Sequence, residues 1–352
     1  SKDQTAYFKY VYVIMREIII KNNEAGQRFD KLLRKYLPQA PAGFIYKMLR
    51  KKNILLNGKK ASGSEMLQER DTVKLFLSEE TIGKFSSDRK GADYATLSPV
   101  KLDILYEDAH VLAINKPAGM LSQKAKPEDR SLVEYVIQYL LRKGELIGKD
   151  LCTFKPSVCN RLDRNTSGII MAGKSLSGLQ KLGELFKERT LAKYYLCLVN
   201  GKVREPRHIC GYLCKDKEAN IVVVKQQKET QEDLPIETEY EPVAWSQELS
   251  LLRVHLITGR THQIRAHLAS IGHPILGDTK YGTKKVPSYY RKKYKIQWQM
   301  LHAYELVMPE LTGEFTPLSK KRIYAPVPGT FYEIIKETAW EHGTQEALEV
   351  LH

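Results

Sequence analysis

The sequence predicts an α+β protein, in which a small basic α+β unit near the N-terminus precedes a larger domain built on a mostly antiparallel mixed sheet. After about residue 100, strand-like segments follow one another in hairpin-like succession, with helical segments interspersed between them. Positive charge is concentrated before about residue 60. At 352 residues with 42% hydrophobic side chains, the chain is long enough to form two separate cores.

Composition and periodicity divide the chain into five expected segments. We expect an N-terminal extension and first strand over residues 1–25, the basic unit over 26–80, a linker over 81–99, the large domain over 100–331 and a helical tail over 332–352. Met15 fits a natural start, so residues 1–14 are read as an upstream extension. Residues 79–99 have no apolar periodicity and are rich in Ser, Gly and charge, which predicts that the basic unit is tethered rather than fused.

The basic unit is predicted to contain two short helices followed by a small sheet. Apolar residues recur at helical spacing over residues 29–37 and again over 44–49, on either side of a Pro-Gln-Ala-Pro segment. An Asn-Gly pair within residues 54–61 predicts a hairpin turn after a strand, and a further strand follows over 70–77. Between residues 26 and 60, ten Lys and Arg side chains stand against one acid. The outer side of the helix pair is therefore expected to be basic.

The large domain is predicted to mix strands with two clear helices. Strands are expected over 101–108, 110–117, 168–174, 193–202 and 251–257, and helices over 132–143 and 177–188. The acidic stretch 228–242 is expected to be a surface excursion that faces away from a polyanionic partner.

Charge and cysteine content indicate the class of partner and the compartment. The formal net charge of +15 favours a polyanion such as nucleic acid. Five cysteines without a CxxC pair fit reduced thiols in the cytosol better than a disulfide framework. The apolar run before Met15 is interrupted by Lys9 and Arg16, so it is too short for a membrane span or a signal peptide. We therefore expect a cytoplasmic protein.

Several kinds of chemistry lack their sequence patterns. There is no GxxxxGK[ST], no GxGxxG after a strand and no GxSxG, which argues against nucleotide hydrolysis, dinucleotide redox chemistry and serine-hydrolase chemistry. His262 and His267 are five residues apart, about 140° around a helix, so they do not form the i, i+4 pair of a zinc site. No metal site is predicted, and His255 and His273 are expected to be hydrogen-bonded structural groups.

Asp163 is the strongest single candidate for chemistry. It lies between Arg161 and Arg164, just before a Thr-Ser-Gly turn and an apolar strand. Two cations that close should keep the carboxylate ionised, which makes it usable as a base, a nucleophile or half of an ion pair. A purely structural salt bridge is the alternative. The place of Asp163 in a polar turn, within a chain expected to bind nucleic acid, favours a functional role.

Two parts of the chain resemble known families. The segments "RFDKLLRKYL", "KMLRKKNILLNGKKA" and "ERDTV" resemble the S4 RNA-binding domain. The segment "NRLDRNTSGIIMAGKS" resembles the catalytic-aspartate motif of the RluA family of pseudouridine synthases, with Asn160 where that family has His. "ILYEDAHVLAINKPAGML", "KYYLCLVNG", "GRTHQIRAHL" and "GHPILGDTKYG" are similar to further motifs of the family, in the expected order and as far as about Phe331. The subgroup typified by RluC is the most similar.

The RluA resemblance implies a role for each matching residue. Asp163 would be the catalytic carboxylate, attacking the ribose C1′ or taking a proton from C2′. Arg161 would fill the space left by a uridine that flips out of its helix, Tyr195 would stack on the extruded base, and Arg265 would pair with Asp163. The presence of Asn160 in place of the family's His puts only a supporting hydrogen bond in doubt. Arg164 has no implied role, and a phosphate contact is expected for it.

The resemblances also imply partners. The S4-like unit would grip structured RNA through phosphates, with contacts expected from Arg28, Arg34, Lys47, Arg50, Lys51 and Lys52. The expected partner is large-subunit ribosomal RNA, and the expected protein is a monomer that needs neither cofactor nor metal and has no membrane partner. The alternative is an RNA-binding factor that uses its larger domain as a clamp without catalysis.

Overall fold

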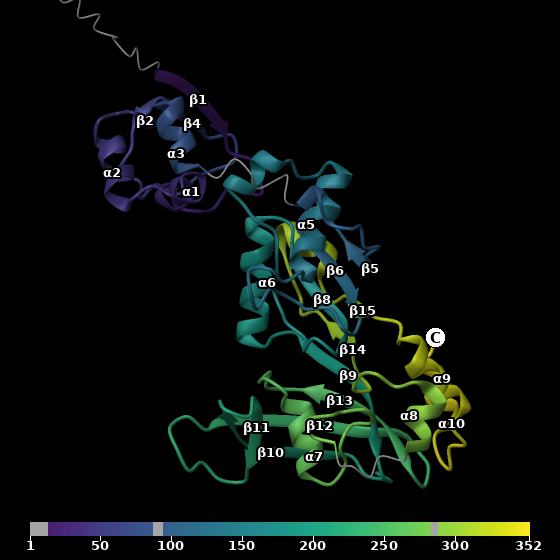
Figure 1. The fold of residues 1–352 in the computed structure, drawn as a ribbon. Helices are drawn as coiled ribbons and strands as arrows, with labels where there is room; N and C mark the ends of the chain where they lie inside the picture. Colours follow the sequence, from purple (N-terminus) through teal and green to yellow (C-terminus); the bar gives the residue numbers. More distant parts are fainter. Residues whose placement is uncertain (1–12, 87–93, 283–287) are drawn as a thin grey trace, which may run out of the picture.

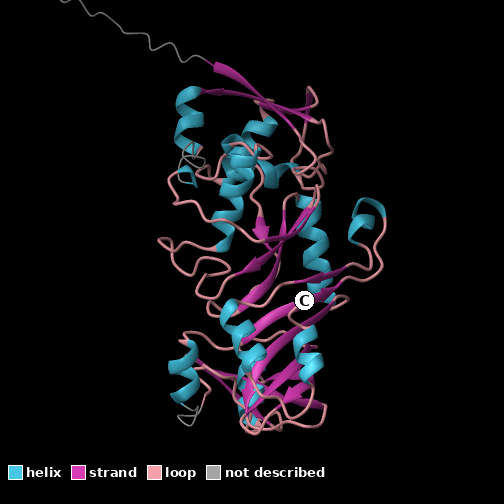
Figure 2. Ribbon diagram, turned by 90° about the vertical axis from the view of Figure 1, so that its right-hand side faces the viewer, coloured by secondary structure: helices cyan, strands magenta, loops and turns pink. Residues whose placement is uncertain are grey.

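The structure is a computed structural model that describes residues 13–86, 94–282 and 288–352. Most of the extension expected over residues 1–14, and residues 87–93 of the expected linker, lie outside these ranges. The described chain forms a four-stranded sheet and an 11-stranded sheet, each with helices packed on it (Figure 1 and Figure 2). The predicted α+β class is confirmed. Figure 1 shows the small sheet and its helices at one end of the molecule and strands β10 to β12 at the other.

The small N-terminal unit has the predicted helix pair and sheet. Helices α1 (Phe29–Tyr36) and α2 (Ala42–Arg50) bury their apolar faces. The sheet has the order β1 (Val13–Ile19), β4 (Thr72–Ser78), β2 (Ile54–Leu56) and β3 (Lys59–Lys60). Asn57 and Gly58 both have positive φ, which fits the predicted hairpin turn. Because β1 pairs with β4 along its whole length, the folded unit begins before residue 26.

The first residues of the expected linker are helical, which corrects that expectation. Helix α3 (Glu79–Phe85) begins at Ser78, whose side chain accepts a hydrogen bond from the Thr81 N–H at 3.1 Å. Ile82 is buried in the core of the unit, and Phe85 lies 4.8 Å from Phe44 between ring centroids. Two apolar residues on one short helix are too few to form a visible periodicity, so the sequence pattern misses this helix.

The small unit is docked on the large domain, so the tethered arrangement expected from the sequence is wrong. The buried side chains of Glu24 and Thr153 hydrogen-bond each other, and Lys21 pairs with Asp150 at 2.7 Å. The Leu176 N–H also donates to the Asn23 carbonyl at 3.0 Å. These contacts lie at the 3-10 helix η1 (Gly148–Cys152) and at the start of helix α6. Burial raises the pKa of Glu24, against the hydrogen bond from Thr153.

Strand β9, from the middle of the sequence, lies at the centre of the large sheet. The order of this sheet is β11-β10-β12-β13-β9-β14-β8-β6-β5, with β7 and β15 paired beside it, and its pairings are antiparallel except β8 with β14. The strands are β5 (Ile104–Glu107), β6 (Val111–Lys116), β7 (Ser157–Val158), β8 (Ser167–Gly173), β9 (Ala192–Asn200), β10 (Arg207–Asp216), β11 (Ile221–Lys225), β12 (Leu234–Trp245), β13 (Leu249–Leu256), β14 (Leu301–Val307) and β15 (Arg322–Tyr324).

Strand β8 is buried on both faces, which explains its continuous apolar run. Ile170 and Ala172 belong to the main core with helix α5 (Leu132–Lys143), whereas Ile169 and Met171 face a second core with helix α6 (Leu176–Glu188). Both helices were predicted. At Gly168 a Cβ would lie 2.3 Å from the Ala303 carbonyl oxygen, so only glycine permits the close parallel approach of β14.

The C-terminal residues belong to the large domain rather than to a separate tail. They are helical as predicted, but α9 (Gly329–Glu337) crosses the expected boundary at 331 and 332, and α10 (Thr344–Glu349) follows it. Phe331, Ile334 and Trp340 lie in the main core. The remaining elements are α7 (Gln263–Ser270), α8 (Ser288–Tyr294) and the 3-10 helix η2 (Gly313–Leu318). No helix of the described residues is long and apolar enough to cross a bilayer.

The acidic stretch 228–242 differs from the surface excursion predicted for it. From Leu234 it forms most of strand β12, inside the large sheet. Its glutamates alternate with buried residues, because successive side chains of a strand point to opposite faces. Glu239 pairs with His255 at 3.1 Å, and His255 stacks on Tyr194. Tyr194 precedes Tyr195 on β9, so these glutamates lie on the face opposite to Tyr195.

Candidate active site

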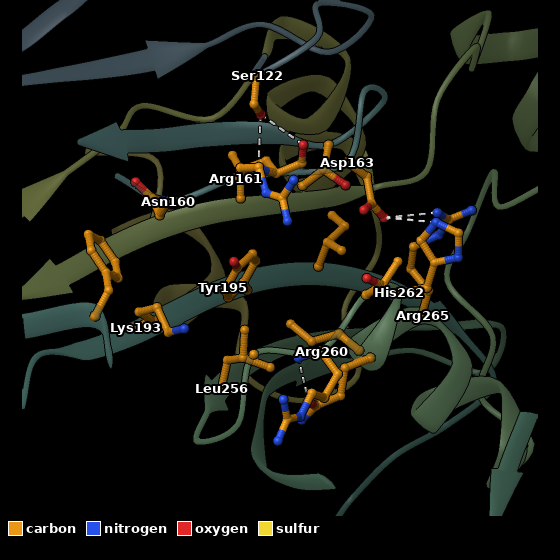
Figure 3. A pocket seen from close by; sticks show the side chains of 18 of the residues that line it. Ser122, Asn160, Arg161, Asp163, Lys193, Tyr195, Leu256, Arg260, His262 and Arg265 are labelled. Carbon is orange, nitrogen blue, oxygen red and sulfur yellow. Dashed lines mark hydrogen bonds and ion pairs between the residues drawn. The ribbon is translucent and has the colours of Figure 1, made fainter. Parts of the chain in front are cut away.

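A cavity of about 670 Å³ opens on the Tyr195 face of the large sheet, and among the described residues Asp163 is the single carboxylate that lines it. Asp163 comes from the loop between β7 and β8, Tyr195 from β9, and Arg265 from the first turn of α7. Figure 3 shows these side chains turned toward the same space, with Arg161 beside them. The fold therefore gathers the four predicted residues, which are separated by up to 104 positions in the sequence, at one site.

The Asp163 loop is held by hydrogen bonds between the side chains of Ser122 and Asn160 and backbone groups. Ser122 bonds the Leu162 N–H at 3.0 Å and the Leu162 carbonyl at 2.8 Å. Asn160 accepts from the Met171 N–H at 2.8 Å and donates to the Ile169 carbonyl at 3.2 Å, so it anchors the loop to β8. The asparagine thus makes a supporting contact with both ends of its amide. The carboxylate is presented on a rigid turn rather than a mobile one.

Lys116 ties a second segment to this loop. Its ammonium is fully buried and donates to the carbonyls of Pro117, Met120 and Arg164 at 2.9, 2.7 and 3.0 Å. The Gly119 N–H and the Arg164 carbonyl add a bond of 2.8 Å. Burial lowers the pKa of Lys116 to about 7, and the negative charge of Asp163 opposes that shift. The residues around Met120 and those after Asp163 therefore form one connected wall.

Arg265 pairs with Asp163, as the resemblance implies, through one hydrogen bond. Its Nη1 donates to Asp163 at 2.9 Å, whereas Nε and Nη2 donate to the two oxygens of Asp278 at 2.7 and 3.0 Å. The Asp278 side chain is 0% exposed and that of Asp163 is 27% exposed. Arg265 is therefore fixed in space by Asp278, and its remaining N–H aims Asp163 into the cavity.

Electrostatic interactions keep the buried pair of Arg265 and Asp278 charged. Burial tends to lower the pKa of Arg265, but hydrogen bonds and charges from Asp278 and Asp163 raise it overall. Burial likewise tends to raise the pKa of Asp278, and Arg265 outweighs it, so that pKa is lowered. The guanidinium stays protonated and Asp278 stays ionised when water leaves the site.

Tyr195 presents its ring to the cavity from the sheet. Its side chain lies on the wall below Asp163, and the residue is 9% exposed. Burial raises the pKa of its hydroxyl, and the charge of Asp163 raises it further. The phenol is therefore neutral at physiological pH, which suits an aromatic surface better than a base.

The two arginines beside Asp163 do not pair with it. Arg161 is exposed at the cavity and has no hydrogen bond or ion pair within the described ranges. Arg164 donates to the Gly119 carbonyl at 3.3 Å, which gives it a role in holding the loop. Within the described ranges, the arginine that contacts Asp163 is Arg265, from a distant segment, rather than either of these two neighbours in sequence.

His262 is a further neighbour of Asp163. Its Nε2 lies 3.8 Å from the carboxylate, and its Nδ1 lies 2.8 Å from the Tyr281 hydroxyl, which accepts from the Val222 N–H at 2.9 Å. The Tyr281 hydroxyl keeps its own proton and a second lone pair, so either tautomer of a neutral imidazole can form this bond. Burial lowers the pKa of His262, with Asp163 opposing that shift, which favours the neutral form.

A cluster of side chains of metal-ligating type lies elsewhere. Within the described ranges, His208, Cys210 and Glu237 bring ligand atoms within 4.8 Å of one another, on the β10 and β12 surface opposite the cavity. His255 and His273 are hydrogen-bonded, to Glu239 and to the Asn200 carbonyl, as predicted. Nothing in the described lining of the cavity assembles such a cluster around Asp163.

Sequence reasoning missed Lys116, Ser122 and Asp278 as parts of this site. Lys116 and Asp278 lie inside the family-like segments "INKPAGML" and "GDTKYG", so their presence there was the available signal. A lysine or aspartate in a segment gives no sign of burial, which depends on chain segments that come together only in the fold.

Comparisons with known proteins agree with this architecture. A family model described as RNA pseudouridylate synthase matches residues 110–270. An uncharacterized RNA pseudouridine synthase of Mycoplasma genitalium is 30% identical over 308 residues, covering 87% of this chain and 93% of the relative. The ribosomal large subunit pseudouridine synthase C of Rickettsia bellii is 32% identical over 300 residues, covering 83% and 92%. The solved structure of human RNA pseudouridylate synthase domain containing 4 has a similar fold, with a TM-score of 0.53 and 20% identity over 71% of this chain and 92% of that one.

Proposed function

This chain belongs to the RluA/RluC family of RNA pseudouridine synthases, and we propose that it isomerises specific uridines of large-subunit ribosomal RNA with Asp163 as the reacting carboxylate. RNA is its substrate and the reaction is an isomerisation. The alternative of a non-catalytic clamp is therefore set aside. The proposed target rests on the name of the Rickettsia bellii relative.

The reaction needs an anion beside the sugar of the target nucleotide. Converting uridine to pseudouridine breaks the N1–C1′ bond, turns the base and joins it to the ribose through C5, without oxidation or loss of atoms. A carboxylate can form a covalent adduct at C1′, stabilise positive charge there, or take the C2′ proton. The observation that carries the proposal is the placement of Asp163, the cavity's single carboxylate, under the N–H of a fixed Arg265.

A base in a duplex must be extruded before it can react. Extrusion costs a few kcal/mol, which the protein recovers by stacking the base and filling the gap. We assign stacking to Tyr195, whose ring faces the cavity, and gap filling to Arg161, whose guanidinium is exposed and free of partners among the described residues.

Substitutions at Tyr195 separate stacking from hydroxyl chemistry. Tyr195→Phe retains the ring and is expected to keep most of the rate, whereas Tyr195→Ala removes a stacking surface worth about 1–3 kcal/mol and is expected to slow turnover roughly 10-fold to 100-fold. Single-turnover rates on one RNA measure the difference. Equal losses in the two variants would contradict the stacking role and point to the hydroxyl.

We propose that the N-terminal unit is an S4-like RNA-binding domain. Arg34, Lys47, Arg50, Lys51 and Lys52 are exposed and have no ion-pair partner in the described part of the chain. Arg28, also proposed as an RNA contact, pairs with Asp30 at 3.1 Å and keeps 48% of its side chain exposed. Since the unit docks through buried Glu24, its cations are held in a fixed position relative to the cavity.

Neutralising one face of α2 tests this role. Lys47, Arg50 and Lys51 lie at i, i+3 and i+4, opposite the buried face of the helix. Replacing all three with Gln is expected to weaken RNA binding and to reduce the slope of log affinity against log salt by about 0.7–0.9 for each phosphate that the variant no longer neutralises. The matched control replaces Lys215, Lys217 and Lys228 with Gln, at the other end of the molecule. An equal effect of both triple variants would contradict a specific RNA surface.

We further propose that the protein acts as a cytoplasmic monomer without a cofactor or metal. Release of tritium from RNA labelled at uridine C5, by purified protein treated with a chelator and given no additive, tests the activity and the lack of a cofactor together. Loss of particular pseudouridines from the ribosomal RNA of a strain lacking this protein identifies the target. If the large-subunit RNA of that strain keeps all its pseudouridines, the proposed target is wrong.

A further inference from the structure

Lys193 is a partly buried cation in the cavity, and its ammonium has no partner among the described residues. It lies two residues before Tyr195 on β9, so both side chains point to the same face, and Figure 3 shows its ammonium directed into the cavity. Within the described ranges, it forms no hydrogen bond or ion pair. More deeply buried lysines are satisfied: Lys116 has three carbonyl acceptors, and Lys174 has Glu107, Glu145 and the Asp108 carbonyl. Lys193 is the exception that needs an explanation.

Two arginines line the cavity together with Lys193. Arg260 lines the same wall, and its Nε is buried with no hydrogen-bond partner among the described residues. Arg189, the residue that ends α6, also lines the cavity. Burial lowers the pKa of Lys193, and the nearby charge of Arg189 lowers it further. The cavity's one carboxylate, Asp163, is already held by Arg265. This side of the cavity is therefore positive and uncompensated.

The backbone makes room for the ammonium. A Cβ on Gly259 would lie 3.0 Å from Lys193 Nζ, so the backbone of this turn packs closely against the ammonium. The turn at Gly259 and Arg260 is held in place because Gln263 accepts from the Arg260 N–H at 3.1 Å and bonds Thr258 at 2.8 Å. The arrangement is a fixed concave site rather than a loose group of surface charges.

We propose that Lys193, Arg260 and Arg189 form a phosphate subsite that binds a backbone phosphate of the RNA next to the extruded uridine. An unpaired charge taken out of water is costly, so its retention indicates an anion that arrives with the ligand. The uracil ring and the ribose are neutral, and the phosphates are the anionic groups of RNA. This inference rests on the proposed function, which places a target nucleotide in this cavity.

The test asks whether the effect of Lys193 on RNA affinity depends on the charge of one particular phosphate. The probe is the shortest synthetic ribosomal RNA stem-loop in which the wild-type protein forms pseudouridine, prepared with one neutral methylphosphonate linkage at a time around the target uridine. Binding is measured in an Asp163→Asn background, so that the RNA is not converted. One linkage adjacent to the target is expected to cost roughly 10-fold to 100-fold in affinity with Lys193 present and less than about 2-fold with Lys193→Met.

A second measurement separates ligand binding from a structural role. Without RNA, Lys193→Met is expected to raise the thermal midpoint, on the order of 2–4 °C, because it removes a desolvated charge from the free protein. The control is Lys292→Met, at an exposed position of α8, which is expected to change neither the midpoint nor the coupling.

Three outcomes would overturn the inference. Lys193→Met could lower the midpoint without RNA, or the methylphosphonate penalties could be the same with and without Lys193, or Lys292→Met could show the same coupling. Absence of pseudouridine from every RNA treated with the wild-type protein would instead refute the proposed function. The two failures are therefore distinguishable.

Discussion

Asp163→Asn is expected to abolish tritium release from RNA labelled at uridine C5, by at least about 10³-fold, because the amide can neither attack C1′ nor take a proton from C2′. Asparagine has nearly the same shape, and its carbonyl oxygen can still accept the Arg265 N–H that Asp163 accepts at 2.9 Å. The loop is also held independently of this side chain, by Ser122 and Asn160. The loss should therefore be chemical rather than structural.

Two control measurements on Asp163→Asn are its affinity for RNA and its unfolding midpoint. RNA affinity is expected to stay within about 3-fold of the wild type, since Asp163 makes no contribution to the basic surface, and the unfolding midpoint is expected to change little. Asp216→Asn, in the β10–β11 hairpin, is the matched control on an exposed aspartate and should keep full activity. Tritium release by Asp163→Asn at the wild-type rate would refute the assignment of Asp163.

Arg265→Met is expected to damage both stability and activity. It leaves the fully buried Asp278 without its ion-pair partner, a change that typically costs about 3–5 kcal/mol of unfolding free energy. The substitution also removes the Arg265 hydrogen bond that directs Asp163 into the cavity. Denaturant unfolding measures the first effect and single-turnover pseudouridine formation the second.

A double variant separates the two effects of Arg265. In Arg265→Met with Asp278→Asn, the buried unpaired charge is gone, so much of the lost stability should return, while activity should stay low because Asp163 is still unsupported. A return of activity together with stability would show that Arg265 acts only through the fold. The Asp278→Asn variant alone is expected to retain the bond to Asp163 but to allow Arg265 to move.

The local pattern of the chain predicted much of the fold. Helices α1, α2, α5 and α6 follow from apolar spacing, and the β2–β3 hairpin follows from the Asn-Gly pair. These features depend on residues within about one helical turn or one hairpin, whose preferences are local. The prediction missed the short helix α3 because that helix rests on Ile82 and Phe85 packing against the rest of the unit.

The candidate residues themselves were also present in the sequence. The segments around Asp163, Tyr195 and Arg265 indicated a pseudouridine synthase before any geometry was known, and the comparisons confirm that family. Asp163 was singled out by its place in a polar turn before an apolar strand. The sequence by itself thus determined the fold class, the local elements, the family and the carboxylate on which the proposed chemistry depends.

Only the tertiary structure decided how these groups are paired. The charge that neighbours Asp163 comes from Arg265, 102 residues away, and not from Arg161 or Arg164, although these are close in sequence. The docking of the N-terminal unit through Glu24, the burial of Asp278 and the unpaired ammonium of Lys193 within the described chain likewise depend on contacts between distant segments. Burial and ion pairing are properties of the packed chain, because desolvation and partner distance exist only after distant segments meet. For that reason the sequence identified the reacting residue, and the fold decided what holds it and what surrounds it.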